Sequence, residues 1–227
     1  MRTEDYTPDA ICRSLGIGAF DEPFKHGKPV EQLRLLLCPS FAPELSITLS
    51  KVAAAPDRAR GRSSADKKTI LSVAASRTQI WTMVAPGLVT VDHVKSEMSS
   101  VTLKDLEMKF RSALAAPPLS TVMLDGMPVS AVWRRFGSSI LVKDTPAKDS
   151  PFGNFVAEVV NLAFEVSDNI SCRNALARAG CYVGLDLPME AVTEPRPKTQ
   201  VSVLGAPDDQ NELLAALAAA AGQQTHL

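Results

Sequence analysis

The segment Ser120-Thr-Val-Met-Leu-Asp-Gly-Met-Pro-Val-Ser-Ala-Val-Trp133 predicts more about the fold than any other part of the chain. Asp125-Gly126 supplies the two positive-φ positions of a two-residue type I′ turn, and apolar residues alternate with polar ones on both sides. We therefore expect a β-hairpin in which Val122 pairs with Val129. One face of this hairpin is predicted to be apolar and to carry Val122, Leu124, Met127, Val129, Ala131 and Trp133.

Four further segments have the composition of strands. Residues 33–38 form a short apolar run, and in 45–50 the apolar residues Leu45, Ile47 and Leu49 alternate with polar ones. Residues 69–76 and 79–84 are interpreted as a third strand or a bent pair of strands, and residues 139–143 follow the hairpin. Together with the hairpin they predict two three-stranded antiparallel meanders.

Each predicted meander is followed by helix. Residues 102–116 have apolar residues at helical spacing and end before Pro117-Pro118. Residues 154–168 are apolar around most of the helix, which predicts a core helix lying across the sheet. Its single polar stripe consists of Glu158, Asn161, Glu165 and Asp168. A shorter helix is expected at 171–179, ending at Gly180 as a left-handed C-cap.

These elements predict an α+β domain over residues 1–187, with a mainly antiparallel sheet of about six strands and helices packed on it. The two meanders either pair edge to edge in one sheet or form two similar halves. Residues 1–40 have many helix breakers and little periodicity. Residues 188–227 are expected to be an appendage with a proline-rich linker, a short strand at 201–204 and a C-terminal helix at 209–221.

Composition excludes several classes of protein. Hydrophobic residues make up 45% and charged residues 22% of the 227-residue chain, as in globular proteins. A formal net charge of −1 argues against a globally basic nucleic-acid binder, and the basic segment 56–68 has no aromatic residues to stack on bases. The longest apolar run, 213–221, is too short to span a bilayer.

Cysteine usage indicates a reducing compartment. The four cysteines are scattered, without a C-x-x-C pair, and are interpreted as free thiols: Cys12, Cys38, Cys172 and Cys181. The N-terminus has no basic region followed by an apolar run, so we expect a cytoplasmic protein. The alanine-rich composition is typical of bacterial proteins. Neither a metal nor a cofactor is predicted.

Catalytic motifs are missing from the sequence: no phosphate-binding G-x-x-x-x-G-K-[ST], no G-x-S-x-G and no H-E-x-x-H occurs. The weak catalytic candidates are Asp92, His93, Asp125 and Glu158. Asp92 and His93, with Glu97 nearby, combine an acid and a histidine in a segment expected to be a loop between the first meander and the first helix. The alternative interpretations are an exposed loop histidine and, for Glu158, the solvated edge of a core helix.

Trp133, Arg134 and Arg135 are the candidate binding residues, because tryptophan and arginine are enriched at interface hot spots. Trp133 falls on the apolar face of the predicted hairpin, where packing in the core is the alternative. Arg134 is expected on the opposite face, against a partner or in water.

Two functional hypotheses follow. The first is a non-catalytic cytosolic protein-binding module of the adaptor, immunity or assembly-accessory kind, which forms a homodimer through its C-terminal segment. The second is an enzyme or small-molecule-binding protein whose site is assembled from residues distant in sequence.

Overall fold

The computed structural model describes residues 7–20, 31–52, 68–80, 89–98, 100–116, 126–135 and 138–191. All of them belong to Met1–Val192, whereas the predicted strand at 201–204 and helix at 209–221 lie outside the described residues. The elements are α1 (Pro8–Ser14), β1 (Glu31–Leu37), β2 (Leu45–Val52), β3 (Lys68–Ser76), β4 (Val91–Met98), α2 (Ser100–Ala115), β5 (Val129–Arg135), β6 (Ser138–Asp144), α3 (Pro151–Val166) and α4 (Ile170–Tyr182).

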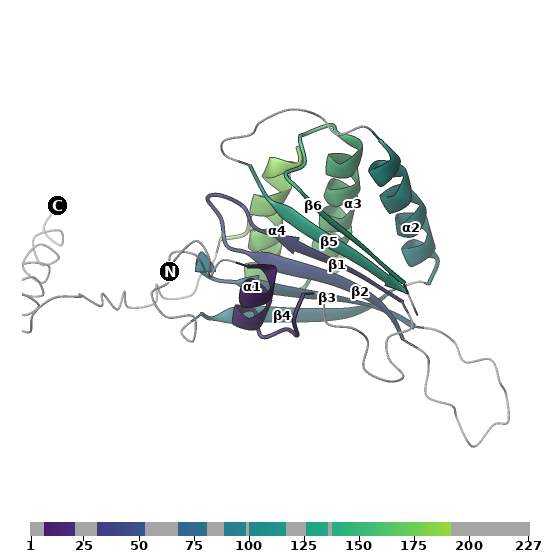
Figure 1. Ribbon diagram of the computed structural model, residues 1–227. Helices are drawn as coiled ribbons and strands as arrows, with labels where there is room; N and C mark the ends of the chain where they lie inside the picture. The colour runs from purple at the N-terminus through teal and green to yellow at the C-terminus, as the bar shows by residue number, and fades with distance from the viewer. Residues whose placement is uncertain are drawn as a thin grey trace, which may run out of the picture. The chain divides into compact units, whose positions relative to one another are not determined.

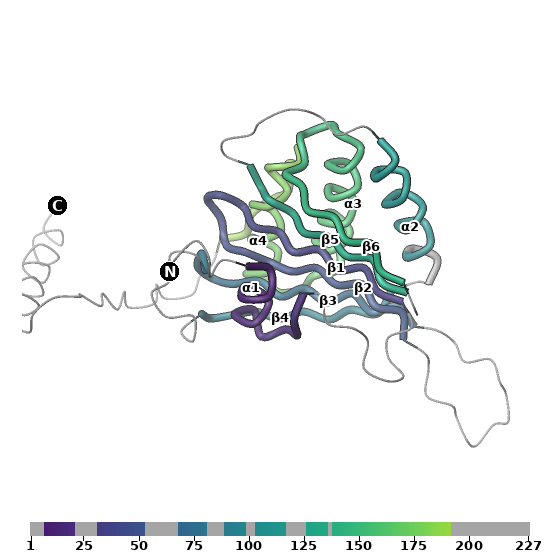
Figure 2. The backbone as a smooth tube through the Cα atoms, viewed as in Figure 1, coloured from purple at the N-terminus to yellow at the C-terminus, as the bar shows by residue number. Residues whose placement is uncertain are grey.

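The six strands form one antiparallel sheet in the order β4-β3-β2-β1-β5-β6 (Figures 1 and 2). β1 pairs with β2 on one side and with β5 on the other, so it joins the first meander to the second. The predicted α+β class and the edge-to-edge pairing of the meanders are confirmed. The first meander has four strands rather than three, because β4 adds to it.

The pairing predicted for the hairpin at Asp125-Gly126 is wrong. Both edges of β5 are occupied, since Val129 pairs with Leu37 of β1 and with Asp144 of β6. The other predicted arm, 120–124, and Asp125 itself lie outside the described residues. The predicted apolar face is nevertheless confirmed for its described residues, because alternation determines which face a side chain occupies but not which strand lies beside it. Met127, Val129, Ala131 and Trp133 are buried together on this face, and Val132 is buried on the opposite face.

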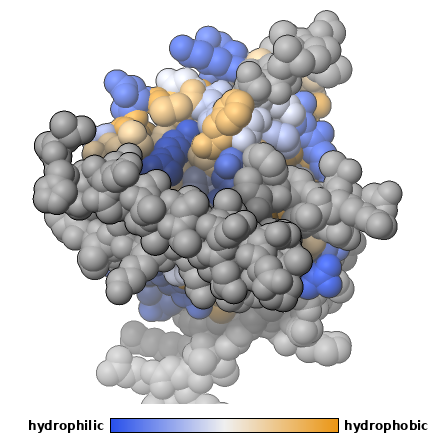
Figure 3. Space-filling view, turned by 90° about the vertical axis from the view of Figure 1, so that its left-hand side faces the viewer, coloured by the Kyte–Doolittle hydropathy of each residue, from blue (hydrophilic) through white to orange (hydrophobic). Residues whose placement is uncertain are grey.

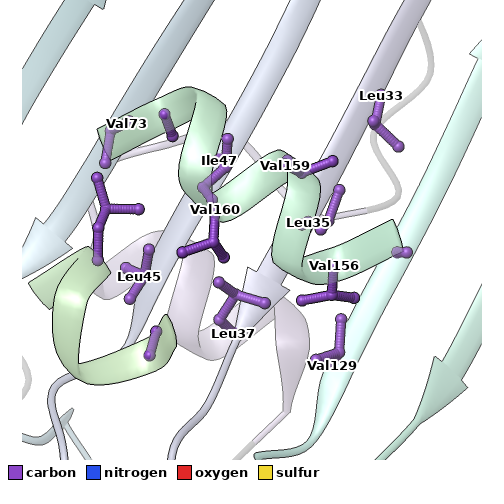
Figure 4. Close-up of a cluster of buried hydrophobic side chains, with 14 of the residues drawn as sticks. Leu33, Leu35, Leu37, Leu45, Ile47, Val73, Val129, Val156, Val159 and Val160 are labelled. Atoms are coloured by element: carbon purple, nitrogen blue, oxygen red, sulfur yellow. The ribbon is translucent and has the colours of Figure 1, made fainter. Parts of the chain in front are cut away.

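Three helices, α2, α3 and α4, cover one face of the sheet, which we call the first face (Figure 1). α3 begins at Ser150, whose Oγ accepts a hydrogen bond from Gly153 N at 2.8 Å, and Pro151 occupies the first helical position. The valines of α3 lie over the leucines and isoleucine of β1 and β2, as Figure 4 shows. The prediction of a core helix across the sheet is therefore confirmed.

α1 lies on the opposite face of the sheet, which we call the second face. The sequence, with its many breakers and little periodicity in residues 1–40, did not predict this helix. Thr7 Oγ1 accepts from Ala10 N at 3.2 Å and Pro8 opens the helix, but seven residues are too few to show helical periodicity. α1 and the residues after it bury Ile11, Cys12, Leu15 and Phe20 against Leu36, Ala74, Ile80 and Val132.

The end predicted for the helix at 171–179 is also wrong, since α4 runs through Gly180 to Tyr182. The left-handed glycine is instead Gly184, with φ of 84°. Gly180 is needed for a different reason: a Cβ there would lie 3.2 Å from Leu185 Cβ and 3.2 Å from Leu187 Cδ1. The chain leaving α4 therefore packs directly on its last turn.

Candidate functional site

A cavity of about 450 Å³ opens on the second face of the sheet beside α1. We call it the sheet pocket. Its floor comes from β1, β2, β3 and β4, and Gly16, Ile17 and Gly18 form part of its wall. The polar lining side chains are Gln32, Arg34, Ser46, Thr48, Ser50, Ser72, His93 and Lys95.

Strand alternation and register bring these side chains together. In β2, the apolar residues of 45–49 face the helices, so Ser46, Thr48 and Ser50 face the pocket. Thr48 lies opposite Arg34 of β1 and Ser72 of β3, and Ser72 lies opposite Lys95 of β4. We call these four residues the Arg34–Lys95 row. Because adjacent strands are about 4.8 Å apart, the row places two hydroxyls between two cationic side chains.

Most of the pocket's polar groups have no partner within the described part of the chain. No hydrogen bond or ion pair there involves the side chains of Thr48, Ser72, His93 or Lys95. Ser46 is only 1% exposed, and its Oγ likewise has no hydrogen-bond partner. These groups retain their full capacity to bind a ligand.

Two arginines attach the wall of the pocket to the sheet. Arg34 Nη1 donates to Gly18 O at 3.2 Å and to Ala19 O at 2.9 Å. Arg134 Nη2 donates to Phe20 O. These bonds to backbone carbonyls fix residues 18–20 above the strands, so the wall is held by charge-assisted hydrogen bonds.

Gly16 completes this wall in a conformation that favours glycine. Its φ is 66°, and a Cβ there would lie 3.7 Å from His93 Nε2. His93 therefore lies against the turn that follows α1.

The electrostatic character of the pocket is cationic. Its lining includes the side chains of Arg34, His93 and Lys95, and within the described part of the chain none of the lining residues is an aspartate or glutamate. Glu97 lies two residues after Lys95, but its Oε2 accepts a hydrogen bond from Lys68 Nζ at 3.0 Å. The described lining of the pocket thus combines positively charged side chains with hydroxyl donors.

The segment holding Asp92 and His93 is a strand, so the prediction of a loop is wrong. Val94 is the one buried residue of the edge strand β4, so β4 has little of the apolar alternation from which strands are recognised. His93 is exposed at the sheet pocket, whereas Asp92 forms an ion pair with Arg77, with Nε–Oδ2 at 2.9 Å and Nη2–Oδ1 at 3.0 Å.

The catalytic candidates do not converge. Glu158 lies on α3 and forms an ion pair with Lys109 of α2, and Asp125 lies outside the described residues. Of the three described candidates, only His93 lines the sheet pocket. The alternative interpretation of Glu158 as the polar edge of a core helix agrees with its half-exposed position.

The three candidate binding residues lie in different environments. Trp133 is 2% exposed on the first face, where its ring stacks on Phe110 with centroids 6.0 Å apart. Arg134 is 5% exposed beneath Phe20, so the expectation that it faces water or a partner is wrong. Arg135 alone is exposed. The three residues do not form one surface.

Sequence reasoning missed the residues that line the pocket, apart from His93. A signal was present in the polar half of the alternation in 45–50, where the second-face positions are all hydroxyl residues. Arg34, which interrupts the leucines of β1, follows the same pattern. The missing information was the strand register, which brings Ser72 and Lys95 alongside.

The four cysteines are free thiols. Burial raises the pKa of Cys12 to about 11 and that of Cys172 to about 12, so both are protonated at neutral pH and neither is an activated nucleophile. Within the described ranges, no group of three or more His, Cys, Asp or Glu residues is placed to hold a metal ion.

Comparisons of the chain with protein-family models, curated protein sequences and solved structures give no match. Among the helices described, none is both long enough and apolar enough to cross a membrane.

Proposed function

We propose that the chain binds a small polar molecule in the sheet pocket. The observation that carries this proposal is the Arg34–Lys95 row, in which Thr48, Ser72 and Lys95 have no partner within the described residues. A volume of about 450 Å³ lies in the usual range for pockets that hold small molecules. This corresponds to the second of the two functions predicted from the sequence.

The floor of the pocket is well suited to positioning a ligand. Thr48 and Ser72 belong to β2 and β3, which are flanked by strands on both sides and backed by the helix-covered face. Their hydroxyls are thus held on a rigid support before any ligand arrives, which reduces the entropy cost of binding. Gln32 Nε2, which donates to Ser50 Oγ at 3.0 Å, fixes a third hydroxyl.

The test is a screen of small polar compounds against the full chain by protein-observed NMR. Binding in the pocket should shift the amide signals of β2 and β3. Ser72→Ala should weaken binding about fivefold, the effect of losing one hydrogen bond of about 1 kcal/mol. Ser130→Ala is the matched control, because Ser130 is also a half-buried serine of this face but does not line the pocket.

The proposal fails if ligands that bind the chain perturb other elements and leave β2 and β3 unshifted. It fails equally if Ser72→Ala and Ser130→Ala bind a pocket ligand with the same affinity as the unaltered chain.

A second candidate function is protein binding, and the exposed edge of β6 favours it. Among the described strands, β6 has a neighbour on one side only, and Leu141 in its centre is 48% exposed. A strand from a second copy of the chain can add to such an edge and form a homodimer. Sedimentation of the full chain beside Leu141→Lys tests this, and a monomer in both would eliminate dimerisation through β6.

Among the described residues, the other large apolar side chains that are exposed do not gather at β6. They are Phe41, Met108, Ile170 and Met189, and they belong to separate segments of the chain. On the part of the surface visible in Figure 3, hydrophilic and apolar residues are intermixed. The adaptor, immunity or assembly-accessory role therefore depends on β6 or on residues outside those described. A cytoplasmic location is part of our proposal and is supported by the four free thiols.

A further inference from the structure

The chemistry of the sheet pocket narrows the class of its ligand, provided that the proposed function holds. We infer that the ligand carries an oxyanion, a phosphate or a carboxylate group, that lies over the Arg34–Lys95 row. The row presents hydroxyl donors at its centre and a positive side chain at each end. Both oxyanions accept hydrogen bonds from this set of groups.

The balance of charge around the pocket excludes a cationic ligand. Among the described residues that line the cavity none is acidic, and the second-face Glu97 is already paired with Lys68. A cation would therefore be repelled by Lys95, which forms no ion pair within the described residues, and by the positive charge of Arg34. An anion would instead be attracted by both side chains, and because they lie at the edge of a partly enclosed cavity, water would screen them less than on an open surface.

The two cationic residues have different roles in this arrangement. Arg34 Nη1 bonds the carbonyls of Gly18 and Ala19, so this residue supplies charge while also holding the wall. Lys95 is exposed on the edge strand β4 and forms no ion pair within the described part of the chain. Lys95 is thus the residue whose charge can be removed without disturbing the wall of the pocket.

The sheet offers a closely matched control for Lys95. Lys143 is exposed on β6, the opposite edge strand, and register places it on the same face of the sheet. It does not line the pocket. Lys95→Gln and Lys143→Gln therefore make the same chemical change on one face, at the pocket and away from it.

The experiment titrates the full chain with four probes and follows the amide signals of β2 and β3 by NMR. The probes are inorganic phosphate, glycerol 3-phosphate, succinate and the neutral polyol myo-inositol. We expect the anions to bind and inositol not to bind. Lys95→Gln should weaken anion binding about tenfold, Lys143→Gln should leave it unchanged, and added salt should weaken it in the unaltered chain.

The outcomes separate the two proposals. Stronger binding of the phosphates or of succinate identifies which oxyanion the pocket prefers, and either supports the inference. If inositol binds and the anions do not, the inference of an oxyanion ligand is overturned and the proposed function stands. Equal anion affinity in Lys95→Gln and Lys143→Gln also overturns it. If none of the four probes shifts β2 or β3, both the inference and the proposed function fall.

Discussion

The two faces of the sheet are built from the same strands but differ in almost every physical respect. On the first face, β1 and β2 have six residues fully buried under α2, α3 and α4: Leu33, Leu35, Leu37, Leu45, Ile47 and Leu49. On the second face, α1 covers only a small cluster around Leu36, and polar side chains line the rest of the floor of the pocket. Stability is thus concentrated on one face, which leaves the other available for binding.

The largest expected effect on stability comes from a substitution in the core of the first face. Phe110 is fully buried and its ring lies between those of Trp133 and Phe155, with centroids 6.0 and 5.2 Å away. Phe110→Ala should lower the free energy of unfolding by about 3–5 kcal/mol, because it removes apolar contact and leaves a cavity. Chemical denaturation measures this loss. A loss below about 1 kcal/mol would show that the first face does not hold the fold together.

The contrast between the faces also explains how much the sequence predicts. Alternation in 45–50 and the broad apolar surface of 154–168 correctly predict the sheet face and the core helix, because burial requires apolar residues at fixed spacings. Polar residues on the second face carry no such constraint. His93, in the segment expected to be a loop, and the missed helix α1 both lie on this second face.

The pocket could not be predicted for a related reason. Ser72 and Lys95 meet Thr48 only through the register of two strand pairs, and register depends on pairings between distant parts of the chain. The same limit accounts for the wrong partner assigned to Val129, since an alternating strand fits beside many others. Local patterns therefore identify elements, while their neighbours require the whole fold.

The next prediction sharpens the comparison at the wall of the pocket. Arg134→Met should lower the free energy of unfolding by about 2 kcal/mol, because Phe20 O loses its charge-assisted donor in a buried position. Hydrogen exchange at residues 18–20 should become faster. Arg135→Met, at the exposed neighbouring position, is the control and should change stability by less than about 0.5 kcal/mol. Equal effects of the two substitutions would contradict the role of Arg134.

A smaller effect compares one buried thiol from each face. Burial raises the pKa of Cys12, on the second face, to about 11 and that of Cys172, on the first face, to about 12, from an ordinary value of 9.0. Below pH 9.0 both thiols are protonated in the folded and the unfolded chain, and stability is not reduced. As the pH rises toward about 11 and about 12, the thiols ionise more readily in the unfolded chain, so the free energy of unfolding falls. By about pH 10 each thiol should cost on the order of 1 kcal/mol, measured by denaturation across this range.

Cys12→Ala and Cys172→Ala should each make the alkaline fall in stability less steep, since alanine cannot ionise. If the unaltered chain had the same free energy of unfolding at about pH 8 and at about pH 10, the burial of both thiols would be contradicted.

The smallest expected effect concerns two buried serines of the second face. One of the two substitutions should raise the free energy of unfolding, whereas Phe110→Ala should lower it. Ser46 Oγ has no partner, whereas Ser76 Oγ donates to Glu44 O at 3.0 Å. Ser46→Ala should raise the free energy of unfolding by about 0.5–1 kcal/mol, because it removes an unsatisfied polar group, and Ser76→Ala should lower it by about 1 kcal/mol. Denaturation of both variants side by side measures the difference, and a loss of stability in Ser46→Ala would mean that its hydroxyl is already bonded. A residue that lowers stability is retained when binding requires it. If Ser46→Ala both raises the free energy of unfolding and weakens ligand binding, the unpaired hydroxyl of this face is connected to its proposed function.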